Sequence, residues 1–224
     1  MGDHESADTA PVPEKSSGMS PGLTFHYKTY SFVVLLGAPG GTFNFTGQQL
    51  FSVFGKYGKG NVIQQQGLVG IVLGDSNQLI IQPPRITFKG ATEEILQELY
   101  RNARPLVLRP FESHPAAAFG INFELDIESN DIQSGQVLRK LLGETVAKWL
   151  TLRSATVERE SSFYTLKSSD EQPGWLNLSI NNHIDKPQVP HFDDEMLKAQ
   201  IASFRKVNET TVKELYECVQ KLQS

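Results

Sequence analysis

Apolar and polar side chains alternate without interruption from Phe119 to Glu128. The odd positions are Phe119, Ile121, Phe123, Leu125 and Ile127, and the even positions are Gly120, Asn122, Glu124, Asp126 and Glu128. Successive side chains of a strand point to opposite faces, so the segment predicts a strand with one face on a core and the other in solvent. Such half-buried strands are typical of antiparallel and mixed sheets. We expect Phe119–Glu128 to be the central strand.

Shorter alternating or apolar segments predict further strands of the same sheet. They are Phe25–Leu36, Asn61–Gln66, Leu68–Leu73, Gln78–Gln82, Arg85–Phe88 and Trp175–Ile184. Gly67 and the segment Gly74–Asn77 provide turn residues, as in a meander of short strands. Thr151–Lys167 fits either a pair of strands or one long bent strand.

Helical spacing of apolar residues marks three segments before the C-terminal region. Thr46 and the glutamine three positions later have the form of a capping box, which predicts a short helix ending near Gly55. Thr92 is the predicted N-cap of a second helix, which Pro105 ends. A third helix is expected after Asp131, with apolar positions up to residue 150.

The longest helical pattern runs from Asp193 to Leu222 and carries apolar residues on one face. Thr211–Glu214 has the form of another capping box, so the pattern predicts either one long helix or a break near Asn208. Together the elements predict an α+β fold, with a mostly antiparallel sheet and helices packed on one face. The order of strands and helices also indicates two related β/α modules.

The first 22 residues differ in composition from the rest of the chain. They are rich in proline, serine and glycine and contain few large apolar groups, which predicts a disordered tail. Residues 23–224 are then expected to form a single α+β domain.

Composition and charge narrow the classes of protein that the chain can represent. The formal net charge is −4, which disfavours a dedicated nucleic-acid-binding protein. The longest apolar run, Phe32–Leu36, is far shorter than the roughly 20 residues of a membrane-spanning helix. The start of the chain lacks the apolar region of a secretory signal, and a lone cysteine, Cys218, is typical of a reducing compartment. We therefore expect a soluble cytoplasmic protein with no membrane partner.

His183, His191 and Asp193 form the densest set of metal-binding or acid–base side chains in the sequence. They predict a metal site, and with it a metal-assisted hydrolase as the alternative function. Two histidines one helical turn apart can place both imidazoles on one metal, but His183 and His191 do not have that spacing. Asp193 equally fits a helix N-cap after a proline-containing loop.

The polar face of the central strand is a second candidate. Its side chains are Asn122, Glu124, Asp126 and Glu128, whose oxygens suit Mg²⁺ or Ca²⁺. Neighbours on one strand face are roughly 6.5–7 Å apart, so one ion needs ligands from another strand. A solvated acidic face paired with Arg153 and Arg159 is the alternative.

The glycine-rich loop at residues 55–60 is a third candidate. Lys56, Tyr57 and Lys59 combine cationic and aromatic side chains, which can contact phosphate and stack on bases. The same glycines also fit a helix end that runs into a turn. The negative net charge of the chain makes nucleic acid an unlikely partner. If nucleic acid does bind, this loop is the predicted contact.

The chain resembles a loose group of uncharacterised microbial α+β proteins. The likeness is carried by Pro84–Phe88, a helix, the strand Phe119–Phe123, the strand Trp175–Asn181 and a long terminal helix, in that order. The likeness covers about the last two-thirds of the chain. It implies an α+β fold with a Gly-x-Asn strand, and no activity. No catalytic motif or cofactor signature is recognisable, so the sequence favours a non-catalytic binding or interaction protein. A protein partner or self-association as a homodimer is expected through the C-terminal helix.

Overall fold

The computed structural model describes residues 22–37, 46–57, 59–108, 116–130, 133–143, 153–169, 172–185, 187 and 191–221. The predicted tail up to residue 21 lies outside the described residues, as does the end of the third predicted helix.

Nine described strands form one antiparallel sheet. They are β1 (Leu23–Leu36), β2 (Gly60–Gln65), β3 (Leu68–Leu73), β4 (Asn77–Gln82), β5 (Arg85–Gly90), β6 (Ala116–Ser129), β7 (Ser154–Arg159), β8 (Ser162–Ser168) and β9 (Trp175–Asp185). Their spatial order is β2-β3-β4-β5-β1-β6-β9-β8-β7. The predicted central strand is the main part of β6, which pairs with β1 along almost its whole length. The segment Thr151–Lys167 contains two strands, β7 and β8, rather than one bent strand.

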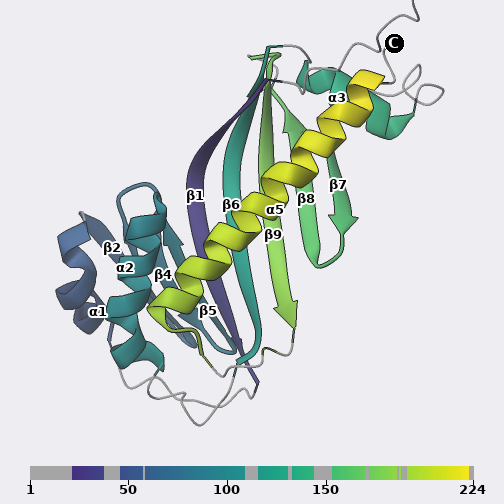
Figure 1. Cartoon of the computed structure of the whole chain (residues 1–224). Helices are drawn as coiled ribbons and strands as arrows, with labels where there is room; N and C mark the ends of the chain where they lie inside the picture. Colours follow the sequence, from purple (N-terminus) through teal and green to yellow (C-terminus); the bar gives the residue numbers. More distant parts are fainter. Residues whose placement is uncertain are drawn as a thin grey trace, which may run out of the picture.

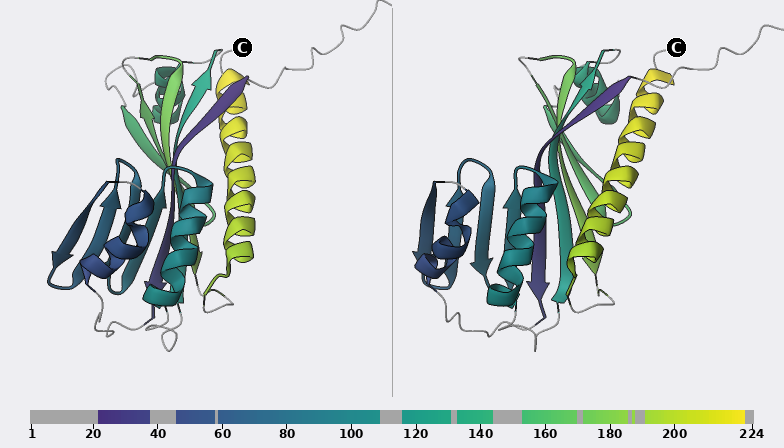
Figure 2. Two further views of the ribbon diagram at one scale, coloured as in Figure 1. Left: turned by 90° about the vertical axis from the view of Figure 1, so that its left-hand side faces the viewer. Right: turned by 60° about the vertical axis from the view of Figure 1, so that its left-hand side comes forward.

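Four described α-helices cover one face of this sheet, so the α+β class is confirmed. They are α1 (Gly47–Phe54), α2 (Glu93–Ala103), α3 (Ser134–Leu142) and α5 (Asp194–Lys221), with one-turn segments η1 (Gly55–Tyr57) and η2 (Arg104–Leu108) after α1 and α2. Figure 1 shows α5 crossing the sheet diagonally from α2 to α3, and Figure 2 shows it on a single side of the strands.

The predicted caps set the starts of these helices. Thr46 and Gln49 form both bonds of a capping box at α1, and the Thr92 hydroxyl accepts a hydrogen bond from Ile95 at α2. At α5 the Asp193 carboxylate accepts a hydrogen bond of 2.7 Å from the amide of Met196. Each cap satisfies a backbone donor that has no partner inside the helix.

The helix α5 does not break near Asn208. It continues for 28 residues, because Asn208 is buried and accepts a hydrogen bond of 2.8 Å from the Tyr164 hydroxyl. Thr211, the predicted cap of a second helix, instead accepts a hydrogen bond from Arg159. The polar residues that indicated a helix end are therefore side chains that join α5 to the sheet.

An aromatic cluster fills the core between the sheet and α2. Phe32 on β1 stacks on Phe88 and Phe119 from the two adjacent strands, and the ring of Tyr100 on α2 meets Phe32 edge-on. Phe192, just before α5, closes the cluster with its ring centroid 4.3 Å from that of Phe119. Offset and edge-to-face contacts of this kind add to the stabilisation that comes from apolar burial.

The two halves of the chain have related topologies. The order β1-α1-β2-β3-β4-β5-α2 in the first half corresponds to β6-α3-β7-β8-β9-α5 in the second. β1 and β6 pair at the middle of the sheet, and outward from them β5 matches β9, β4 matches β8 and β3 matches β7. This arrangement approximates a twofold axis between β1 and β6. In the described residues, β2 has no counterpart in the second half.

Candidate binding groove

A groove lies between α5 and the β7–β8 hairpin, on the helix-covered side of the sheet. It consists of two adjoining cavities of about 260 Å³ and about 340 Å³, which share Arg159, Tyr164 and Thr211 in their walls. We call the two together the α5 groove. It exists because α5 crosses the strands diagonally and leaves the turn end of the hairpin uncovered (Figure 1).

The smaller cavity is apolar. Val157, Leu166 and Leu178 come from β7, β8 and β9, at positions that face the helices. Val212, Leu215 and Cys218 face them from α5, where a spacing of three or four residues places side chains on one side of a helix. Pockets lined mainly by apolar side chains with a few polar groups at the rim are typical ligand-binding sites.

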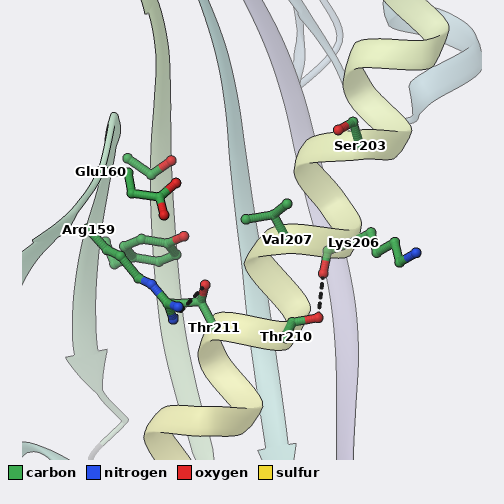
Figure 3. A pocket seen from close by; sticks show the side chains of 9 residues that line it. Arg159, Glu160, Ser203, Lys206, Val207, Thr210 and Thr211 are labelled. Carbon is green, nitrogen blue, oxygen red and sulfur yellow. Dashed lines mark hydrogen bonds between the residues drawn. The ribbon is translucent and has the colours of Figure 1, made fainter.

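The larger cavity is polar and extends to the turn between β7 and β8 (Figure 3). Arg159 lies where the two cavities meet and donates hydrogen bonds to Glu214 at 2.5 Å and to the Thr211 hydroxyl at 3.3 Å. The hydrogen bond that Arg159 donates to Glu214, and then the negative charge of Glu214, raise the pKa of Arg159, which holds the guanidinium in its charged form. Lys206 lines the same cavity and makes no side-chain ion pair within the described ranges.

Buried hydrogen bonds fix the floor of the groove. Ser162 donates to the Asn182 side chain at 2.8 Å, and Asn182 donates to the carbonyl of Ile121 at 2.7 Å. Tyr164 is tied to Asn208 on α5 by the hydrogen bond described above. Because each of these side chains is buried, the bonds hold β8, β9 and α5 in a defined arrangement.

Glu160, at the turn between β7 and β8, adopts an unusual backbone conformation. Its φ angle is +54°, and it is the one non-glycine residue with a positive φ in the part of the chain that the structure describes. This region costs a residue with a Cβ atom roughly 1–2 kcal/mol. Glu160 lines the polar cavity, so a strained residue lies at the rim of the groove.

The groove combines several kinds of polar side chain with its apolar end. Its lining residues include hydroxyls, one thiol and charged groups but no histidine. Cys218 lies at the apolar end of the groove, and Glu214 is the carboxylate among the residues that line the same cavity.

The structure does not bring the predicted metal ligands into one cluster. His183 lies on the open face of the sheet, opposite Gly120, and contacts Asp185 at 2.9 Å. His191 adjoins Phe192, which packs on the helix-covered face, and Asp193 caps α5. Across the described ranges, no three His, Cys, Asp or Glu side chains are grouped so that they could hold a metal ion.

The acidic face of β6 lies on the open side of the sheet, as the alternation predicts. Its carboxylates contact basic side chains of β1 and β5 instead of Arg153 and Arg159: Lys28–Asp126 at 2.5 Å, Lys89–Glu124 at 3.1 Å and His26–Glu128 at 3.1 Å. Arg159 is wrong as a partner because its position on β7 faces α5. Burial alone would raise the pKa of Glu124, but hydrogen bonds from Thr29 and Lys89 outweigh it and leave the pKa below its ordinary value.

The glycine-rich loop after α1 gives no concentrated basic surface in the described residues. Lys56 lies 3.6 Å from Glu98 of α2, and the backbone carbonyl of Lys59 accepts a hydrogen bond from Gly74. Lys56 and Tyr57 belong to η1, the one-turn continuation of α1. The alternative interpretation, a helix end that enters a turn, describes this backbone.

The apolar stripe of the C-terminal helix is used inside the protein. Leu197, Ile201, Val212, Tyr216 and Val219 are all buried in the common core. The outward positions of α5 include Val207, which is 48% exposed at the rim of the groove. The predicted stripe is therefore part of the core and not a free surface of α5.

Two sequence comparisons identify no relative of the chain. No protein-family model matches the chain, and no curated protein has a significantly similar sequence. The resemblance to microbial α+β proteins stays a prediction. None of the described helices is long and apolar enough to cross a membrane.

Proposed function

We propose that the protein is a non-catalytic binding protein and that it holds a segment of a protein partner in the α5 groove. The observation that supports this function is an apolar cavity of about 260 Å³ that opens beside the outermost described strand. A buried apolar centre with a polar rim is the usual anatomy of a protein-binding surface. Here the rim consists of Arg159, Glu214 and the hydroxyl-rich cavity next to them.

Self-association through the groove is the second form of this function. The apolar stripe of α5 is buried against the sheet. A homodimer could form through that stripe only if the helix left the sheet. The groove requires no such rearrangement. Light scattering of the purified chain measures which oligomeric state it adopts.

The experiment is a selection of random displayed peptides on the purified full-length chain. Selected peptides are synthesised, and their affinities are measured by fluorescence anisotropy against two variants of one groove residue. Cys218→Phe fills the apolar cavity from an exposed position, whereas Cys218→Ser keeps the volume of the side chain. Loss of one buried apolar side chain of the peptide corresponds to about 1.5–3 kcal/mol, or roughly 10- to 100-fold in affinity.

We expect Cys218→Phe to weaken binding by that factor and Cys218→Ser to leave it near the wild-type value. Thermal unfolding of both variants confirms that they fold. If the selection yields no peptide, or if peptides bind Cys218→Phe as tightly as the wild type, the α5 groove is not the binding site.

A further inference from the structure

We propose that the partner segment binds as a tenth strand, antiparallel to β7, with alternate side chains in the α5 groove. This inference rests on the proposed function, because it specifies how the same groove is occupied. It identifies the partner by chemistry as a protein with an extended segment of about six residues, the length of β7.

The first argument is the relation between the two halves of the sheet. On the first side the order outward from the middle is β1-β5-β4-β3-β2, and on the second it is β6-β9-β8-β7. β2 lies antiparallel to β3, the counterpart of β7. The approximate twofold axis therefore places an antiparallel strand at the outer edge of β7, where the described residues provide none.

The second argument is the backbone of β7. Ser168 donates a hydrogen bond to the carbonyl of Arg153, so this pair is hydrogen-bonded. In an antiparallel ladder such pairs alternate, which makes Ala155, Val157 and Arg159 the residues that bond to β8. The amide and carbonyl groups at 154, 156 and 158 consequently point outward, toward the position of a tenth strand. Addition of a strand to a free edge is a known mode of peptide recognition.

The ladder on the first side has the same phase. Val72, Gly70 and Leu68 of β3 lie opposite Asn61, Ile63 and Gln65 of β2. The Gly74 amide donates a hydrogen bond to the Lys59 carbonyl, so 59 and 74 are a hydrogen-bonded pair. Because such pairs alternate along an antiparallel ladder, the three pairs above are hydrogen-bonded too. These residues of β3 have side chains on the open face, as Ser154, Thr156 and Glu158 of β7 do. A strand added to β7 would therefore repeat the geometry of β2.

The third argument is that the groove continues to this edge. Side chains of a tenth strand opposite Ala155 and Val157 would face the helix-covered side, where Val157 lines the apolar cavity. The side chain opposite Arg159 would approach the polar cavity, where Glu214 pairs with Arg159, Glu160 lies at the turn, and Lys206 is the cation without a side-chain ion pair among the described residues. The partner segment is therefore expected to carry an acidic residue followed by apolar residues at the second and fourth positions after it, since an antiparallel strand meets Arg159 first.

The other edge of the sheet lacks this space. The side chain of Val62 on β2 fills the position beside Gly47, where an added Cβ atom would lie 1.9 Å from it. The side chain of Gln64 accepts a hydrogen bond from the amide of Gly47. The helix-facing side of β2 is thus packed against α1, whereas that of β7 opens into the groove.

A second copy of β7 is a less suitable occupant. A symmetric antiparallel pair centred on Thr156 places Arg153 of one copy opposite Arg159 of the other, twice. Like charges directly opposite on one face destabilise strand pairing. We therefore assign the position to a different protein.

The test uses a peptide obtained in the selection above and examines its backbone. Single N-methyl groups are introduced at each residue in turn, and binding to the wild-type chain is measured by fluorescence anisotropy. We expect loss of affinity of roughly 5- to 10-fold or more at alternate residues only, because every second amide of the added strand bonds to β7. Uniform effects, or none, would overturn the strand while leaving the groove as the binding site.

A pair of variants tests the same contact from the side of the protein. Thr156→Pro removes an amide that points away from β8, and proline is tolerated on edge strands. Thr156→Val retains this amide and, like proline, removes the hydroxyl contact of 3.0 Å with Thr165. We expect weaker peptide binding by at least tenfold for Thr156→Pro and no change for Thr156→Val. Equal affinities of the two variants would refute the pairing with β7.

The outcomes separate this inference from the proposed function. Loss of binding in Cys218→Phe without an alternating N-methyl pattern refutes the strand and retains the groove. Insensitivity to Cys218→Phe refutes both. A dimer in light scattering that dissociates in Thr156→Pro but not in Thr156→Val would assign the edge to a second copy and overturn the choice of partner. The N-methyl scan leaves the protein unchanged, so it decides the question even if Thr156→Pro does not fold.

Discussion

Two buried tyrosines provide a direct test of how hydrogen bonding stabilises this fold. Tyr100 on α2 and Tyr216 on α5 are 1% and 0% exposed. The Tyr100 hydroxyl donates a hydrogen bond of 2.6 Å to the carbonyl of Phe192, whereas the Tyr216 hydroxyl has no partner among the described residues. We predict that replacement by phenylalanine changes stability in opposite directions at the two positions.

The magnitudes follow from the cost of an unmade hydrogen bond. Tyr100→Phe leaves the Phe192 carbonyl without its donor and should lower the free energy of unfolding by about 1–2 kcal/mol. Tyr216→Phe removes a buried hydroxyl that lacks a partner, and should raise the free energy of unfolding by about 1 kcal/mol, since such a group costs about 1–3 kcal/mol. Both substitutions keep the ring, so the loss of packing is small at each site.

The assay is urea unfolding of the two variants and the wild type, followed by tryptophan fluorescence and circular dichroism. An unchanged dependence on urea concentration shows that only the stability has changed. In thermal unfolding, each 1 kcal/mol corresponds to about 2–4 °C for a chain of this length. If Tyr216→Phe destabilises the protein as much as Tyr100→Phe does, the Tyr216 hydroxyl has a partner and the reasoning is wrong.

Three further predictions concern single groups. Burial raises the pKa of Tyr216 above its ordinary value of 10.0, so above pH 10 the folded chain keeps a proton that the unfolded chain loses. The free energy of unfolding should therefore fall as the pH rises above 10, and it should fall less steeply in Tyr216→Phe, by up to roughly 1.4 kcal/mol per pH unit, in unfolding measured over a series of alkaline pH values. Glu160→Gly should raise the free energy of unfolding by about 0.5–1 kcal/mol in urea, because glycine tolerates the positive φ; a loss would show that the turn is not strained. Gly90→Ala should lower the free energy of unfolding by about 2 kcal/mol or more, because the added Cβ would lie 2.6 Å from the Leu96 amide nitrogen. Gly120→Ala is the control, since its Cβ meets nothing closer than 3.5 Å; equal stabilities of the two variants in urea would contradict the packing argument.

The sheet could be predicted from the sequence because alternation is a local signal. The polar and apolar positions of Phe119–Glu128 correspond to the open and covered faces of β6, and the turns at Gly67 and Gly74 have the positive φ that glycine allows. The caps at Thr46, Thr92 and Asp193 were predictable for the same reason, since each bonds within four residues.

The groove could not be predicted, because its walls come from distant parts of the chain. Arg159 and Glu214 are 55 positions apart and meet only through the angle at which α5 crosses the sheet. Asn208 and Thr211 look like residues that end a helix, but their side chains bond instead to Tyr164 on β8 and Arg159 on β7. Cys218 on the amphipathic C-terminal helix is exposed and lines the apolar cavity, which nothing in the local sequence indicates.

The departures from an ideal fold are concentrated in the second half of the chain. Glu160 has a strained backbone, and the buried Asn208 amide nitrogen and Tyr216 hydroxyl lack partners in the described ranges, as does the Asn122 side-chain oxygen on the open face of β6. Asn208 bonds to Tyr164, which lines the α5 groove, and Glu160 lies at its rim. In the first half the corresponding space is filled by β2 and α1. Because strained and unsatisfied groups persist mainly where function requires them, Glu160 and Asn208 beside the groove favour it as a functional surface.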